Sequence, residues 1–143
     1  MKIKLIRFKE DVHVPTRAHY DDAGMDCYAP TSVVLPPFNS QGNRATAVSI
    51  PLGFGLYVPN GYMASIRTRS SLNKKGILCQ VGTIDAGYHG EISVILYNLT
   101  PESYHIKKDD RICQIVIEPV IYADFVDELG DERNAGGFGS TGK

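Results

Sequence analysis

The chain has too few cysteines to support a disulfide-stapled or zinc-stabilised fold. Its three cysteines, Cys27, Cys79 and Cys113, are widely spaced and form no CxxC pair. An odd and scattered set of this kind favours neither a disulfide framework nor a zinc site. We expect three reduced thiols that behave as small apolar residues.

Net charge and long apolar runs are also scarce. The formal charge is −1 at pH 7, whereas bulk binding to nucleic acid or to an anionic membrane generally needs a clear basic excess. No segment is apolar over a length that spans a bilayer, and the first seven residues alternate charged and apolar side chains, unlike a signal peptide. We expect a cytoplasmic protein with no nucleic-acid or membrane partner, which holds any anionic ligand locally.

Histidine clusters and serine elbows are missing too. The four histidines, at positions 13, 19, 89 and 105, never recur at a spacing of three or four residues. This pattern disfavours a transition-metal site built by the protein. No glycine-flanked serine elbow supports Ser/His/Asp nucleophilic catalysis.

Helix-length stretches are rare, because Gly or Pro interrupts the 143 residues at intervals of roughly ten. The runs between these breaks favour β-branched and aromatic residues, and the second half of 102–118 alternates with the period of a strand. We therefore predict one all-β domain. The expected strands are 2–8, 32–35, 47–50, 55–58, 62–68, 77–81, 91–97, 111–119 and 123–126, and only 70–75 is predicted to form a helical turn.

The last residues of the chain are rich in glycine and carry an arginine, one aromatic ring and two adjacent hydroxyls. Such an arm can bring backbone N–H groups and an arginine fork to a phosphate, while the ring lies on a flat base. The alternative is a flexible tail without function. Composition alone leaves both interpretations open.

The segment GTIDAGYHGE at 82–91 places an acid, a tyrosine and a histidine between two apolar runs. It predicts a hairpin whose backbone groups can read the edge of a pyrimidine. Asp85 at its tip is placed to orient and deprotonate a water. An ordinary Asp/Gly hairpin with a solvated carboxylate is the alternative.

Cations and two adjacent serines gather in 67–76. The cluster suits a polyphosphate, although Ser70 and Ser71 can equally cap a helical turn. Arg69 is the more informative residue. Asp26 in the segment 23–30 and Gln114 in 110–116 do not distinguish a site from ordinary structure by themselves.

Five segments in one order resemble the five motifs of the homotrimeric dUTPases: AGMD at 23–26, RSSL at 69–72, GTIDAGYHGEI at 82–92, DRICQI at 110–115 and GGFGSTG at 136–142. The resemblance implies a distorted jelly roll of the β-clip type, β-barrel-like, over 1–131, with a flexible arm at 132–143 that closes over the active site. It also implies a homotrimer that hydrolyses dUTP to dUMP and pyrophosphate. This reaction limits uracil incorporation into DNA and supplies dUMP for thymidylate synthesis.

The same resemblance implies residue roles. Asp85 activates the water that attacks the α-phosphate, Tyr88 lies under the deoxyribose, and the backbone of Thr83 and Ile84 contacts uracil. A neighbouring subunit supplies phosphate contacts from Arg69, Ser70, Ser71 and Gln114. The third supplies Arg133, Phe138, Gly139, Ser140 and Thr141, with Phe138 stacking on uracil. Asp26 helps to hold the waters of an Mg²⁺ ion that rides on the triphosphate.

The chain departs from the commonest pattern of these dUTPases at six positions. Thr68 stands in place of a proline, Ser71 and Asn134 in place of glycines, Gly87 in place of a second aspartate, His89 in place of an arginine and Cys79 in place of an asparagine. The departures leave substrate affinity open.

Two other functions remain as hypotheses. The dCTP deaminases share the fold and the RSSL segment, but they need a proton-carrying glutamate where this chain has Ile95, and an isoleucine cannot carry a proton. The other hypothesis is a regulator that uses the same fold to bind a protein partner. The intact Asp85 favours catalysis, with regulation as an added role.

Overall fold

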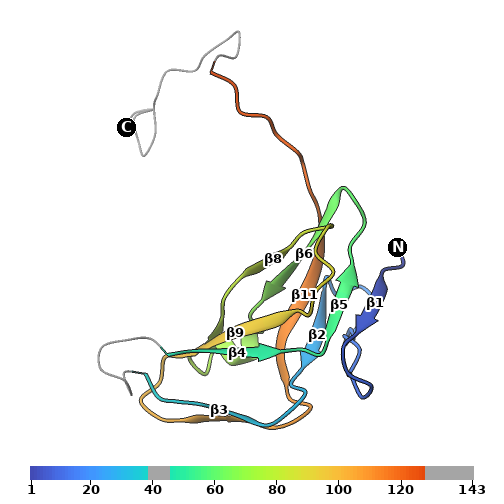
Figure 1. Cartoon of the computed structure of the whole chain (residues 1–143). Helices are drawn as coiled ribbons and strands as arrows, with labels where there is room; N and C mark the ends of the chain where they lie inside the picture. The colour runs from blue at the N-terminus through green and yellow to red at the C-terminus, as the bar shows by residue number, and fades with distance from the viewer. Residues whose placement is uncertain (39–45, 128–143) are drawn as a thin grey trace.

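Short strands make up nearly all the regular structure in the computed structural model, which describes residues 1–38 and 46–127 (Figure 1). The elements in order are β1 (Lys4–Arg7), β2 (Gly24–Tyr28), β3 (Val33–Leu35), β4 (Ala47–Pro51), β5 (Phe54–Tyr57), β6 (Tyr62–Arg67), α1 (Ser70–Asn73), β7 (Ile77–Cys79), β8 (Gly82–Ile84), β9 (Ser93–Asn98), β10 (Tyr104–Ile106) and β11 (Arg111–Pro119). The all-β prediction and the helical turn are confirmed. No helix in these two ranges has the length and apolarity to cross a membrane.

The strands form antiparallel sheets that share one core. The larger sheets have the orders β2-β11-β6-β8 and β4-β9-β7, and the pairs β1-β5 and β10-β3 complete the arrangement. Residues of both larger sheets, such as Ile66, Ile115, Val94 and Leu96, belong to the same buried cluster. Within the described residues no sheet closes on itself, so the architecture is jelly-roll-like rather than a closed barrel.

In the middle of β11, successive side chains alternate between the two faces of the sheet. Cys113 and Ile115 are fully buried, whereas Gln114 between them is only partly buried and faces the opposite side of the sheet. On that outer side Gln114 lies opposite Arg67 of β6 and Asp26 of β2. The alternation therefore fixes which polar side chains share one face.

Two sequence predictions about local structure are wrong, and one alternative that the sequence left open does not hold. The segment 82–91 is not a hairpin, because β8 pairs with β6 whereas β9 pairs with β4 and β7. Alternation shows that both runs are buried, but not which strand each one joins. Residues 123–126 form no strand. The serines of α1 do not cap it, since the cap residue is Arg69 and no side chain bonds to the free backbone groups.

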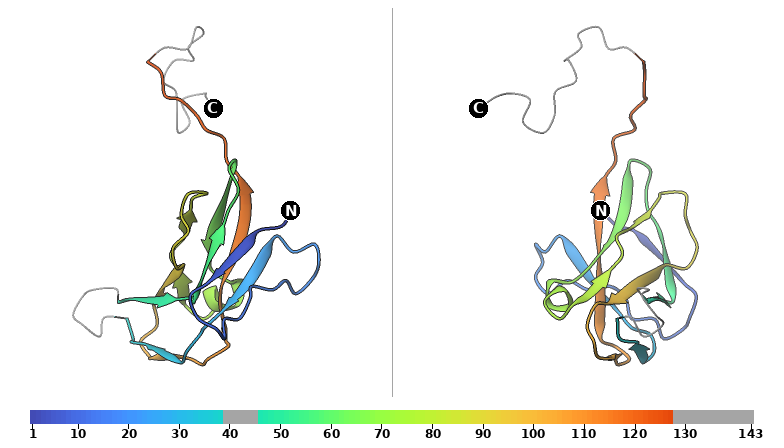
Figure 2. Two further views of the ribbon diagram at one scale, coloured as in Figure 1. Left: turned by 45° about the vertical axis from the view of Figure 1, so that its right-hand side comes forward. Right: turned by 90° about the vertical axis from the view of Figure 1, so that its left-hand side faces the viewer.

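After β11 the chain runs away from the sheets in an extended course through residue 127 (Figures 1 and 2). Its apolar side chains lie in the open: Ile121 is 91% exposed, Tyr122 75% and Phe125 101%. Aromatic side chains contribute most when they are covered, so this segment lacks a packing partner among the described residues. The predicted boundary at residue 131 and the arm beyond it lie outside the described residues.

A polar network sits on the outer face of the β2-β11-β6-β8 sheet. Ser65 is 3% exposed and its hydroxyl donates to Glu118 Oε2 at 2.6 Å, while Arg67 Nη2 donates to Oε1 at 2.6 Å. The hydrogen bond from Ser65, and then the one from Arg67, hold the pKa of Glu118 below its usual value of 4.5. The charged form of Glu118 is therefore the stabilising one.

Glu118→Gln is expected to lower stability near neutral pH and to make it less sensitive to acid. Because the pKa is depressed on folding, the contribution of Glu118 is complete above the unfolded-state pKa of 4.5 and is lost as the pH falls through the folded value. Urea unfolding of both proteins between pH 7 and pH 3 tests this. A stability gap that stays constant below pH 4.5 would contradict the assignment.

Candidate active site

One half of the site lies where β8 ends. Thr83, Ile84, Asp85 and Tyr88 line a cavity of about 250 Å³, here called the β8 cavity. The Tyr88 N–H donates to the Asp85 carbonyl at 3.0 Å, which closes the turn and leaves both side chains exposed. β8 is an edge strand among the described residues, so its outer backbone groups have no strand partner. This half offers an exposed carboxylate beside free backbone donors and acceptors.

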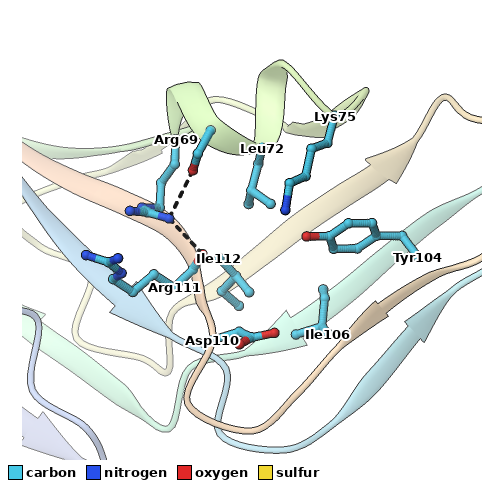
Figure 3. Close-up of a pocket in the computed structure, with 9 residues that line it drawn as sticks. Arg69, Leu72, Lys75, Tyr104, Ile106, Asp110, Arg111 and Ile112 are labelled. Atoms are coloured by element: carbon cyan, nitrogen blue, oxygen red, sulfur yellow. Dashed lines mark hydrogen bonds between the residues drawn. The ribbon is translucent and has the colours of Figure 1, made fainter.

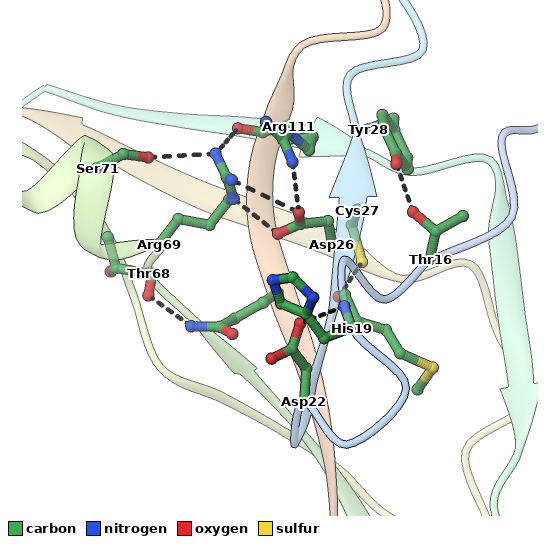
Figure 4. A network of polar contacts seen from close by, with 12 residues as sticks. Thr16, His19, Asp22, Asp26, Cys27, Tyr28, Thr68, Arg69, Ser71 and Arg111 are labelled. Atoms are coloured by element: carbon green, nitrogen blue, oxygen red, sulfur yellow. Dashed lines mark hydrogen bonds and ion pairs between the residues drawn. The ribbon is translucent and has the colours of Figure 1, made fainter.

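The other half lies across the same sheet, where Asp26, Arg69, Ser70, Arg111 and Gln114 line a cavity of about 370 Å³, here called the arginine cavity. Its centre is an ion-pair cluster (Figure 4). Asp26 accepts from Arg69 Nε at 2.7 Å and from Arg111 Nη1 at 3.2 Å, and only 17% of its side chain is exposed. Two guanidinium groups are thus held beside one carboxylate.

Arg69 and Arg111 differ in how many donors the protein uses. Arg69 also donates to Ser71 Oγ at 3.2 Å and to the Arg111 carbonyl at 3.3 Å, so the fork is fixed in place. Arg111 makes a single side-chain hydrogen bond among the described residues, to Asp26, and a guanidinium has five N–H donors. Sequence reasoning missed Arg111, although it stands in the DRICQI segment.

Gln114 owes its position to a glycine. Its Nε2 donates to the Thr68 carbonyl at 3.1 Å, and a Cβ on Gly24 would lie 2.1 Å from its Oε1. No other residue fits at position 24 without moving the amide, which explains the glycine of the AGMD segment.

A second hollow of about 250 Å³ adjoins the arginine cavity, between α1 and the segment 104–112 (Figure 3). Arg69 and Arg111 line both. Lys75 adds a third cation, and its Nζ lies 5.8 Å from the centre of the Tyr104 ring. The basic surface therefore continues past the arginine cavity.

Two residues that depart from the dUTPase pattern, Thr68 and Cys79, are accommodated by hydrogen bonds or by burial. The Thr68 hydroxyl accepts from the Cys79 N–H at 2.7 Å and donates to the Cys79 carbonyl at 3.0 Å, which ties the end of β6 to β7. Burial, with a smaller effect of Cys113, raises the pKa of Cys79 to about 12. The thiol therefore stays protonated, and all three cysteines are free and buried as expected.

Asp26 does not fit the part of a direct metal ligand. Both of its carboxylate oxygens accept from guanidinium groups, and the described residues contain no group of three His, Cys, Asp or Glu side chains that could hold an ion. Hard cations need several oxygen ligands. The predicted contact through water stays a prediction.

The two halves do not meet within one chain. Asp26 is on β2 and Ile84 is on β8, the two edges of a four-stranded sheet, so three strand spacings, about 14 Å, separate them. Within 1–38 and 46–127, no residue lines both the β8 cavity and the arginine cavity. The predicted site residues of the arm, Arg133, Phe138, Gly139, Ser140 and Thr141, lie outside the described residues.

Comparison with known proteins decides the family. The sequence profile described as dUTPase matches residues 10–142. The chain belongs to the dUTPase family. The deoxyuridine 5'-triphosphate nucleotidohydrolase of Nautilia profundicola is 42% identical over the whole of both chains, and that of Ehrlichia canis is 44% identical over 98% of this chain and 94% of its own.

The fold of the dUTPase family agrees with the described structure. The dUTPase of Staphylococcus bacteriophage 80alpha, solved as a G164S mutant with dUpNHpp, superposes with a TM-score of 0.84 at 25% identity and covers 99% of this chain and 98% of its own. The jelly-roll-like fold is thereby confirmed.

Proposed function

We propose that the chain hydrolyses dUTP to dUMP and pyrophosphate, with Asp85 as the base that activates the attacking water. The observation that carries this is the exposed Asp85 carboxylate on the β8 cavity, directly after an edge strand whose backbone is open. A carboxylate close to a bound nucleotide can accept the proton of a water as it attacks phosphorus. The neighbouring backbone of Thr83 and Ile84 reads the uracil.

Phosphate binding falls to the arginine cavity. Phosphate oxygens suit the donors that line this cavity: the fixed guanidinium of Arg69, the free N–H groups of Arg111, the Ser70 hydroxyl and the Gln114 amide. Ser71, which accepts from Arg69, adds a hydroxyl from the adjoining hollow. Arg69 is held by Asp26 before any ligand arrives, which favours a preorganised site. We assign these residues to the triphosphate chain of dUTP.

Mg²⁺ is proposed to enter with the substrate, held by its phosphate oxygens and by water. A triphosphate gathers several negative charges on hard oxygen atoms, the ligands that Mg²⁺ prefers. When bound, the ion would neutralise negative charge on the phosphates. Asp26 is assigned a place beyond the waters of this ion.

Assembly into a homotrimer is proposed because one chain separates the parts that one substrate needs. The apolar segment that follows β11 exposes Tyr122 and Phe125. A groove of about 460 Å³, lined by Ile3, Leu5, Val14 and Ile117 among others, offers an apolar surface on the body. We assign this surface to contacts with the C-terminal segment of a neighbouring subunit, which brings the β8 cavity of one chain to the arginine cavity of another.

A substrate panel tests the proposal. The purified protein is expected to release pyrophosphate from dUTP, with far lower kcat/KM for dCTP, dTTP and UTP, and to release no ammonia from dCTP. Ammonia release would instead favour a dCTP deaminase. Ile95 disfavours that function, because an isoleucine cannot carry a proton. We place the reaction in the cytoplasm, where thiols such as the three buried cysteines stay reduced.

A further inference from the structure

The ring of Tyr88 lies against the backbone of its own turn, at Gly90. The Tyr88 hydroxyl donates to the Glu91 carbonyl at 2.9 Å. A Cβ on Gly90 would lie 2.6 Å from the Tyr88 oxygen and 2.7 Å from Cζ. Backbone strain is not the reason for glycine here, because Gly90 has no positive φ. The ring occupies the space of the side chain that position 90 lacks.

The stretch 53–57, which includes β5, contacts residues 89–91 of this turn. The Gly53 N–H donates to Glu91 Oε1 at 2.9 Å, and the ring of Tyr57 lies 4.1 Å from that of His89. Between these two contacts, a Cβ on Gly55 would lie 2.4 Å from the Gly90 carbonyl oxygen. Every second residue of this stretch therefore meets one residue of 89–91.

Backbone hydrogen bonds lock the same alignment. The Ile92 N–H donates to the Phe54 carbonyl at 2.8 Å, and the Leu52 N–H donates to the Ile92 carbonyl at 2.8 Å. Ile92 is buried, so the end of the turn is anchored in the core. The turn has little freedom to retreat when a methyl group is added.

We propose that Gly90 is a positioning residue for Tyr88, and that Gly55 assists it by letting the turn lie close to β5. The inference rests on the proposed function, in which the Tyr88 ring fills the space that a 2'-hydroxyl would need. Discrimination between dUTP and UTP thus depends on the absence of side chains at positions 55 and 90. His89 takes part through its contact with Tyr57 on the same support.

The test is the ratio of kcat/KM for dUTP to that for UTP. Gly90→Ala is expected to narrow this ratio at least about tenfold, because the methyl displaces the ring that excludes the 2'-hydroxyl. Gly55→Ala is expected to narrow it in the same direction by lifting the Gly90 carbonyl. Gly87→Ala is the matched control: it lies in the same turn, but its Cβ would meet no atom within 4 Å, so the ratio stays at the wild-type value.

A double-mutant cycle separates positioning from a general structural effect. In a Tyr88→Ala background, Gly90→Ala is expected to cause no further change in the ratio, since the displaced ring is gone. An unchanged ratio in folded Gly90→Ala, or an equal effect with and without the ring, overturns the proposal. If Gly90→Ala fails to fold, rescue by Tyr88→Ala supports the contact and failure of rescue refutes it. Absence of pyrophosphate release by the wild type would refute the proposed function instead.

Discussion

Asp85→Asn is expected to lower kcat for dUTP by about 10²–10⁴-fold while the dissociation constant for dUTP stays within a small factor. The amide keeps the size of the carboxylate and much of its hydrogen bonding, but it cannot accept a proton from water. The turn itself is held by the Asp85 backbone carbonyl, which accepts from the Tyr88 N–H. The substitution therefore removes the base and leaves its surroundings in place.

Single-turnover kinetics and equilibrium binding of a non-hydrolysable dUTP analogue separate the two effects. Glu10→Gln is the matched control, because it also removes one exposed negative charge and lines neither cavity. Mass spectrometry excludes deamidation back to aspartate. A variant that keeps more than a few per cent of the wild-type rate after that check removes Asp85 from the role of base.

The sequence predicts best those strands for which the alternation of apolar and polar residues indicates the same bounds as the positions of Gly and Pro. The strand 111–119 has the predicted bounds, since buried and outer residues alternate over Cys113, Gln114 and Ile115 and the run ends at Pro119. β2 was missed because Gly24 and Asp26 are both unfavourable in strands, and tertiary contacts outweigh that preference. β8 was missed because it begins at Gly82, a residue unfavourable in strands, and lies in the segment that was predicted to be a turn; β10 was missed as well.

For the site, too, the sequence predicts which residues take part but not how they are arranged. Asp85, Arg69 and Gln114 could be named from motifs, because the chemistry of each is carried by its residue type. The pairing of Arg111 with Asp26 could not, since it follows from the register that places Cys113 opposite Cys27. Nor could the separation of Asp26 from Ile84, which depends on β11 and β6 lying between β2 and β8.

Two inactive parents, Asp85→Asn and Arg69→Ala, are expected to regain activity when they are unfolded and refolded together. Arg69→Ala removes the guanidinium fixed in the arginine cavity and is expected to be inactive as a homotrimer. If each site takes Asp85 from one subunit and Arg69 from the next, an equal mixture yields about one quarter of the sites with both residues intact. The expected rate is therefore about a quarter of the wild-type rate.

The same parents mixed without unfolding give the background rate, and differently tagged chains verify that subunits have exchanged. The recovery does not depend on the order of subunits around the trimer, because every mixed ring contains one junction at which an intact Asp85 meets an intact Arg69. If one chain supplied both residues to its own site, no mixed ring could contain a complete site. Persistent inactivity after verified exchange would then show that one chain supplies both residues to its own site, although Ile84 lies opposite Ala64 and Arg69 follows five residues later along the chain, about 17 Å in strand geometry.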